Sequence, residues 1–126
     1  MSEQGMKNLE QLYVSKISRR LAEINERFVW GDKTPITDVA AAETMEHILP
    51  PQAARLPYKR VRGGFLWGRL WGTAWFRLRF TIPAAMRGKT VALHFNPGGE
   101  SLIFRDGLPV QGLSWTRYEY IVTPRA

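Results

Sequence analysis

The sequence predicts a mainly β domain, an antiparallel β-sandwich preceded by an amphipathic α-helix. Apolar residues recur at every third or fourth position between residues 8 and 29, which is the period of a helix. From residue 58 the apolar period shortens to two, and short runs of that period are separated by turns that contain Gly and Pro. This spacing is typical of antiparallel sandwiches. We therefore expect a lead-in at residues 1–57 and a sandwich at residues 58–126.

The lead-in begins with the predicted helix at residues 8–29. Its apolar stripe consists of Leu9, Leu12, Tyr13, Ile17, Leu21, Ile24 and Phe28. A second, short helix is predicted within residues 34–49, with Thr37 or Asp38 as its N-cap. Its inward side chains would be Val39, Ala42, Met45 and Leu49. Residues 50–57 contain three prolines, which remove backbone donors, so we expect an irregular linker there.

The sandwich begins with a predicted strand at residues 73–82. Strict alternation turns Phe76, Leu78 and Phe80 inward and Trp75, Arg77 and Arg79 outward. Further strands are predicted at residues 90–95 and 117–122. Between them, residues 100–110 predict a hairpin, because an Asp-Gly pair such as Asp106-Gly107 strongly favours a two-residue turn.

The charge of the chain narrows the possible partners. The formal net charge is +7, and no acidic residue lies between Glu46 and Glu100, where nine basic residues alternate with aromatic ones. Such a pattern is used by proteins that bind single-stranded nucleic acids. Arginine also pairs well with carboxylates across a protein interface, and we favour this second interpretation.

The residues offer no catalytic centre. The chain has no cysteine, which excludes disulfides, thiolate metal sites and a cysteine nucleophile, and is compatible with a reducing cytoplasm. Glu100 and Asp106 lie at opposite ends of one predicted strand, ~20 Å apart, whereas a glycosidase pair lies ~5–9.5 Å apart. His47 and His94 are too isolated to suggest a zinc site. No apolar run approaches the ~20 residues of a membrane helix, and the N-terminus lacks the apolar region of a signal peptide.

Several stretches resemble the N-terminal region of the α-mannosidases of glycoside hydrolase family 38, of the neutral cytosolic type. They are WGTAWFRLRFTIP (71–83), RGKTVALHF (87–95) and GGESLIFRDGLPVQGL (98–113), with weaker likeness in LYVSKISRRLAEI (12–24) and PITD (35–38). The resemblance implies a galactose-binding-like jelly roll and a cytoplasmic location. It also implies a parent enzyme that is a retaining, metal-dependent α-mannosidase acting on free oligosaccharides. The nucleophile and the zinc or similar divalent metal would belong to a catalytic domain downstream, so we expect no cofactor in this chain.

We therefore expect a non-catalytic accessory domain that braces a catalytic domain. The candidate face, for interdomain contact or for mannose-containing oligosaccharides, consists of Trp67, Trp71, Trp75, Arg77 and Arg79. A stand-alone carbohydrate-binding module is the alternative, and a single-stranded nucleic-acid-binding domain is a less favoured one. The family's jelly roll would have further strands after residue 126, so we expect a truncated sandwich that exposes a strand edge and can self-associate.

Overall fold

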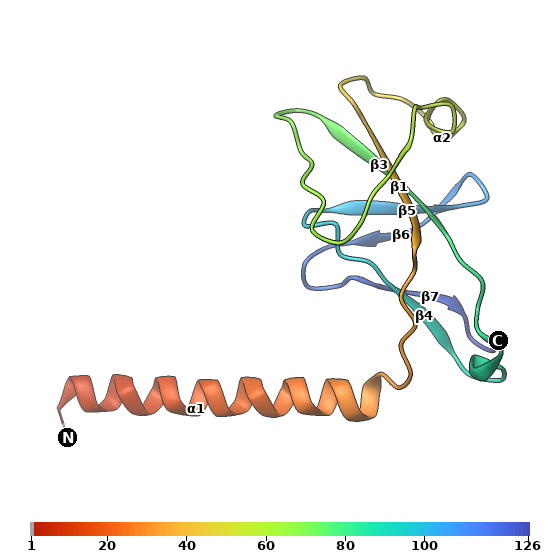
Figure 1. Ribbon diagram of the computed structural model, residues 1–126. Coiled ribbons are helices and arrows are strands. Elements are labelled where there is room, and N and C mark those ends of the chain that lie inside the picture. Colours follow the sequence, from red (N-terminus) through yellow and green to blue (C-terminus); the bar gives the residue numbers. More distant parts are fainter. Residues whose placement is uncertain (1) are drawn as a thin grey trace. The chain divides into compact units, whose positions relative to one another are not determined.

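The computed structural model describes residues 2–126, which form two compact units, one ending at Thr34 and the other spanning Pro35–Ala126 (Figure 1). The first unit is the predicted helix. Helix α1 (Glu3–Ile24) continues into one π-helical turn, η1 (Asn25–Val29). The hydroxyl of Ser2 accepts a hydrogen bond from the backbone N–H of Gly5 at 3.2 Å, which caps the first turn.

The second unit is built from antiparallel pairs of strands, so the predicted fold class is confirmed. The strands are β1 (Asp38–Thr44), β2 (Lys59–Arg60), β3 (Thr73–Arg79), β4 (Val91–His94), β5 (Ser101–Arg105), β6 (Leu108–Leu113) and β7 (Glu119–Thr123). They form a three-stranded sheet in the order β2-β1-β3 and two pairs, β4-β7 and β5-β6. The short helices α2 (Pro50–Ala53) and η2 (Ala84–Met86) lie in the connections.

The helix predicted within residues 34–49 is wrong, because residues 38–44 form the central strand β1. Alanine favours helices when nothing else decides. Here the alanines are needed as small partners in the sheet: Ala41 lies opposite Phe76 and Ala42 opposite Trp75. Strand β1 thus belongs to the same unit as the other strands, and that unit begins at Pro35, ahead of the boundary predicted at residue 58.

The predicted irregular linker at residues 50–57 is wrong in part, since it contains α2. Proline fits the first positions of a helix, where its missing N–H has no intrahelical acceptor in any case. The side chain of Gln52 accepts a hydrogen bond from the N–H of Leu49 at 2.9 Å, and Ala53 is buried. The linker is therefore anchored to the second unit by one helical turn.

The hairpin predicted at residues 100–110 is present as β5 and β6. Arg105 pairs with Leu108, which leaves Asp106 and Gly107 as a two-residue turn. Both have positive φ, 53° and 79°, as a type I′ turn requires.

The core of the second unit is made of small side chains. Among the side chains that the structure describes, Ala40, Ala41, Ala42, Ala53 and Leu113 are buried, and no large one is fully buried. The large apolar side chains of this unit are either half-buried, such as Trp75 and Phe76, or exposed, such as Leu66 and Trp71. No helix within residues 2–126 combines the length and the apolar character that crossing a bilayer requires.

Candidate functional site

An open apolar groove runs between the sheets of the second unit. Its volume is about 920 Å³, and its lining includes Trp75, Phe76, Leu78, Leu93, Phe95 and Phe104. These side chains come from β3, from β4 and the residue after it, and from β5. Phe80, expected to face inward with Phe76 and Leu78, also lines the groove but is 43% exposed, so its predicted place in a closed core is wrong.

Trp75 and Phe76 on β3 both pack against other aromatic rings, which corrects the prediction that Trp75 points outward. Phe76 contacts Phe95 with ring centroids 5.3 Å apart, edge to face. Trp75 contacts Phe104 with ring centroids 5.6 Å apart. The indole N–H of Trp75 is buried and has no hydrogen-bond partner among the described residues. Trp75 is therefore packed between β3 and β5.

Trp67 anchors the loop between β2 and β3 to the rest of the second unit. Its indole Nε1–H donates a hydrogen bond to the carbonyl oxygen of Pro97 at 2.8 Å. Its ring meets Phe76 edge to face at 5.6 Å, and its Cη2 lies 3.6 Å from the position that a Cβ on Gly99 would take. Trp67 is thus a half-buried internal contact of the unit.

Trp71 differs from the other two tryptophans of the candidate face. Its side chain is 86% exposed, and its φ is +63°, in the left-handed region. For a bulky residue this conformation costs about 1–2 kcal/mol. Of the three tryptophans predicted for the site, Trp71 is exposed, whereas Trp67 and Trp75 are half-buried.

Arg77 and Arg79 are exposed on β3, as predicted. The Arg77 guanidinium lies 4.5 Å from the ring centre of Tyr58, in a cation–π contact. Burial raises the pKa of Tyr58 above its ordinary value, and the positive charge of Arg77 partly opposes this rise. Arg79 lies opposite Asp38 in the sheet register, but Asp38 contacts Arg60, at 3.9 Å. Within residues 2–126, neither Arg77 nor Arg79 forms a salt bridge.

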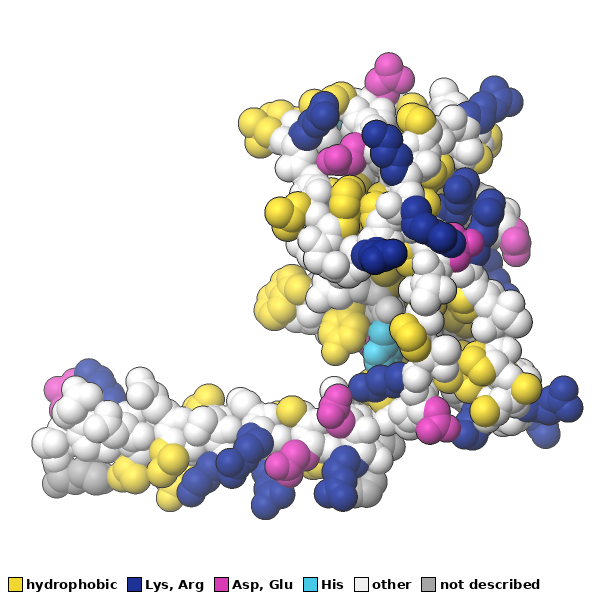
Figure 2. Space-filling model, in the orientation of Figure 1, with side chains coloured by type: hydrophobic (Ala, Val, Ile, Leu, Met, Phe, Trp, Pro, Cys, Tyr) yellow, Lys and Arg dark blue, Asp and Glu magenta, His cyan; other side chains and the backbone are white. Residues whose placement is uncertain are grey.

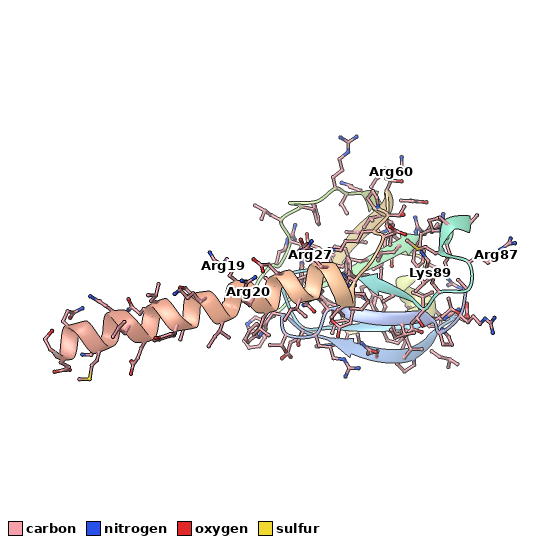
Figure 3. The ribbon with its side chains drawn as sticks, turned by 90° about the horizontal axis from the view of Figure 1, so that it is seen from below. Arg19, Arg20, Arg27, Arg60, Arg87 and Lys89 are labelled. Atoms are coloured by element: carbon pink, nitrogen blue, oxygen red, sulfur yellow. The ribbon has the colours of Figure 1, made fainter. Side chains whose placement is uncertain are left out.

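The surface of the second unit is correspondingly basic. Figure 2 shows Lys and Arg side chains spread over this unit, with hydrophobic side chains protruding between them. Arg60, Arg87 and Lys89, labelled in Figure 3, belong to this set. Arg105 has a structural role, since its Nη1 donates to the carbonyl oxygen of Val122 at 2.7 Å and so joins β5 to β7.

The geometry supplies no catalytic or metal centre within the described residues 2–126. No three His, Cys, Asp or Glu side chains lie close enough together there to hold a metal ion. Asp106 occupies a turn position, and Glu100 precedes β5 at the opposite end of that strand. His94 packs edge to face on Tyr118 at 5.7 Å.

The sequence did not predict the contacts of Tyr58, Phe95 and Phe104 with side chains of β3. They join segments that are distant along the chain, and no local pattern marks which aromatic residues will meet.

Comparison with known proteins gives one family and several longer relatives. A family model described as "Alpha-mannosidase, jelly roll domain" matches residues 32–126. The human protein named Alpha-mannosidase 2C1 is 33% identical over 99 residues, which cover 77% of this chain and 10% of that protein. The mouse protein of the same name is 39% identical over 86 residues, covering 68% of this chain and 8% of that protein. Alpha-mannosidase G of Dictyostelium discoideum is 31% identical over 75 residues, which cover 60% of this chain and 7% of that protein.

The chain thus spans about a tenth or less of the length of these relatives. No solved structure matches the chain.

Proposed function

Because this chain belongs to the family of alpha-mannosidase jelly roll domains, we propose that it is a non-catalytic accessory domain that braces the catalytic domain of an α-mannosidase-like enzyme. One observation carries the proposal: the groove between its sheets is open and lined by aromatic side chains, and no large side chain of residues 2–126 is fully buried. A domain of this kind gains stability when a neighbour covers the groove, since removing apolar surface from water contributes about 25 cal/mol per Å².

The charges of β3 support the same role. Arg77 and Arg79 are exposed and form no salt bridge with the described residues. Arginine forms planar, paired hydrogen bonds with carboxylates, so the surface that meets β3 should be acidic.

The residues of this chain do not fit the metal that the resemblance implies. Zinc in a catalytic site takes three protein ligands, and no such group of side chains exists within residues 2–126. We place zinc, or a similar divalent metal, in the catalytic domain of the parent enzyme and derive no chemical step from this chain.

A domain replacement tests the proposal. In human Alpha-mannosidase 2C1, the segment aligned with this chain is either deleted or replaced by residues 32–126. We expect the deletion to lower the melting temperature and the mannosidase activity, and the replacement to restore both. The replacement that carries Arg77→Glu and Arg79→Glu should restore the melting temperature and the activity to a smaller extent. If the deleted enzyme melts and turns over like the intact one, the bracing role is refuted.

A stand-alone carbohydrate-binding module is the second candidate, favoured by the exposure of Trp71. Isothermal titration of the full chain with mannose oligosaccharides would show binding that Trp71→Ala removes. If the unmodified chain gives no heat of binding, this candidate is eliminated.

A further inference from the structure

The loop between β2 and β3 displays apolar side chains to solvent. Leu66 is 91% exposed, Leu70 is 81% exposed and Trp71 is 86% exposed. Single exposed apolar residues are common on protein surfaces, but a cluster on one loop marks an interaction site. In Figure 1 this loop is the yellow-green stretch that leads into β3.

The loop is anchored just before the turn that carries Leu70 and Trp71. The Trp67 indole is bonded to Pro97, and the backbone N–H of Gly68 donates to Oε1 of Glu43 at 3.0 Å. Within the turn itself, the N–H of Gly72 donates to the carbonyl oxygen of Arg69 at 2.8 Å. A fixed loop presents its side chains with little loss of conformational entropy on binding.

The turn Arg69–Gly72 puts tryptophan where turns ordinarily take glycine. Trp71 is its third residue and has φ +63°, while Leu70 before it is not in the left-handed region. A turn of this form usually has Gly or Asn at the third position, because other side chains are strained there. Strain of this kind clusters at functional sites, where the surrounding structure imposes it. Here the strained residue is also the one whose side chain points into solvent.

We propose that Leu70 and Trp71 insert into an apolar pocket rimmed by carboxylates on the catalytic domain of the parent enzyme. This inference rests on the proposed accessory function and names the element that makes the contact. Charge complementarity identifies the rim: Arg62 and Arg69 flank the displayed side chains and form no salt bridge within residues 2–126. The carboxylate of Glu43 accepts a hydrogen bond from the backbone N–H of Gly68. The matched segment covers 10% or less of each relative, and the remaining length provides a domain to hold such a pocket.

The first test measures the accessibility of Trp71 to acrylamide. Its fluorescence is obtained as the difference between each protein and its Trp71→Phe variant, in the full chain and in the domain-replacement enzyme described above. We expect Trp71 to be quenched freely in the full chain and several-fold less in the replacement enzyme. Trp115, which is 78% exposed in another turn, is the matched control and should stay quenchable in both.

The second test uses the strain itself. Asparagine adopts the left-handed conformation more readily than tryptophan. We therefore expect Trp71→Asn to leave the full chain as stable as before, or more stable, but to lower the melting temperature of the replacement enzyme. Trp115→Asn should not lower that melting temperature. Arg69→Glu should lower it as well, while Arg117→Glu, beside the control tryptophan, should not.

Other outcomes overturn the inference. If Trp71 stays quenchable in a replacement enzyme that is active and heat-stable, the accessory function stands and this contact is wrong. If Trp71 of the isolated full chain becomes protected from acrylamide as the protein concentration rises, its partner is a second copy of the chain. A blue shift of Trp71 on phosphatidylserine vesicles, without protection in the replacement enzyme, would assign the loop to a membrane surface.

Discussion

The turn at Asp106-Gly107 allows one methyl group to be added without any new contact. Gly107 has φ +79°, and a Cβ built on it would meet nothing within 4 Å. The cost of Gly107→Ala is therefore conformational alone, about 1–2 kcal/mol for an L-residue in the left-handed region. Alanine also lowers the entropy of the unfolded chain, which offsets about 0.4–1 kcal/mol. We expect a net loss of about 1 kcal/mol in the free energy of unfolding.

Gly112, in the partner strand of the same hairpin, is the matched control. It does not have positive φ, and an added Cβ would lie 3.9 Å from the carbonyl oxygen of Ser101, an ordinary contact. Gly112→Ala should therefore stabilise the chain, by about 0.5–1 kcal/mol, since glycine weakens a strand interior.

Urea unfolding of the full chain, followed by circular dichroism, measures both changes. With a urea dependence of about 1–3 kcal/mol per M, Gly107→Ala should lower the unfolding midpoint by roughly 0.5 M. Gly112→Ala should raise the midpoint. The reasoning fails if Gly107→Ala unfolds at the same urea concentration as the unmodified chain, or if both variants shift in the same direction.

Further predictions concern Trp67 and Trp75, the pKa of Tyr58 and the apolar stripe of α1. Trp67→Phe removes a hydrogen bond and should lower the free energy of unfolding, measured in urea, by about 1 kcal/mol. Trp75→Phe removes an N–H that has no partner among the described residues, so it should lower the free energy of unfolding by less. Equal losses in the two variants would contradict this reasoning. Burial keeps Tyr58 neutral in the folded state, so stability is fully present below pH ~10 and falls as the pH rises through the raised pKa. Arg77→Ala should raise the pKa of Tyr58 further, as a spectrophotometric titration against Tyr58→Phe would show; an unchanged or lower value would contradict it. Ile17 is 59% exposed on the apolar stripe of α1, so Ile17→Glu should abolish any self-association of the chain through this helix. Light scattering measures the association. If it persists in the variant, another surface of the chain mediates it.

Periodicity was sufficient for most of the elements but not for β1. Alternation and Asp-Gly chemistry located β3 and the β5–β6 hairpin, because both signals are local. In β1 the three consecutive alanines favour a helix locally. The reason they form a strand lies on β3, where Phe76 and Trp75 need small neighbours. Contacts across a sheet overrode the propensity of the segment itself.

The candidate site was predictable as a set of residues but not as an arrangement. Exposure of Arg77 and Arg79 follows from alternation along β3. The partial burial of Trp67 does not, because its partner Pro97 is thirty positions away and contributes only a backbone carbonyl. The left-handed conformation of Trp71 was equally hidden, since the usual signal for it is a glycine at that position.

The three tryptophans of the candidate face show how one composition can hold different roles. Trp67 has a bonded N–H and edge contacts on its ring, so it fixes the loop. Trp75 is packed, but its buried N–H has no partner among the described residues, which is unfavourable. Trp71 has a strained backbone and a side chain exposed to water. Neither of the last two arrangements stabilises the isolated unit, and exposed apolar surface at the groove adds a further cost. Costs of this kind are offset when a neighbouring surface covers them, which is the condition in which an accessory domain works.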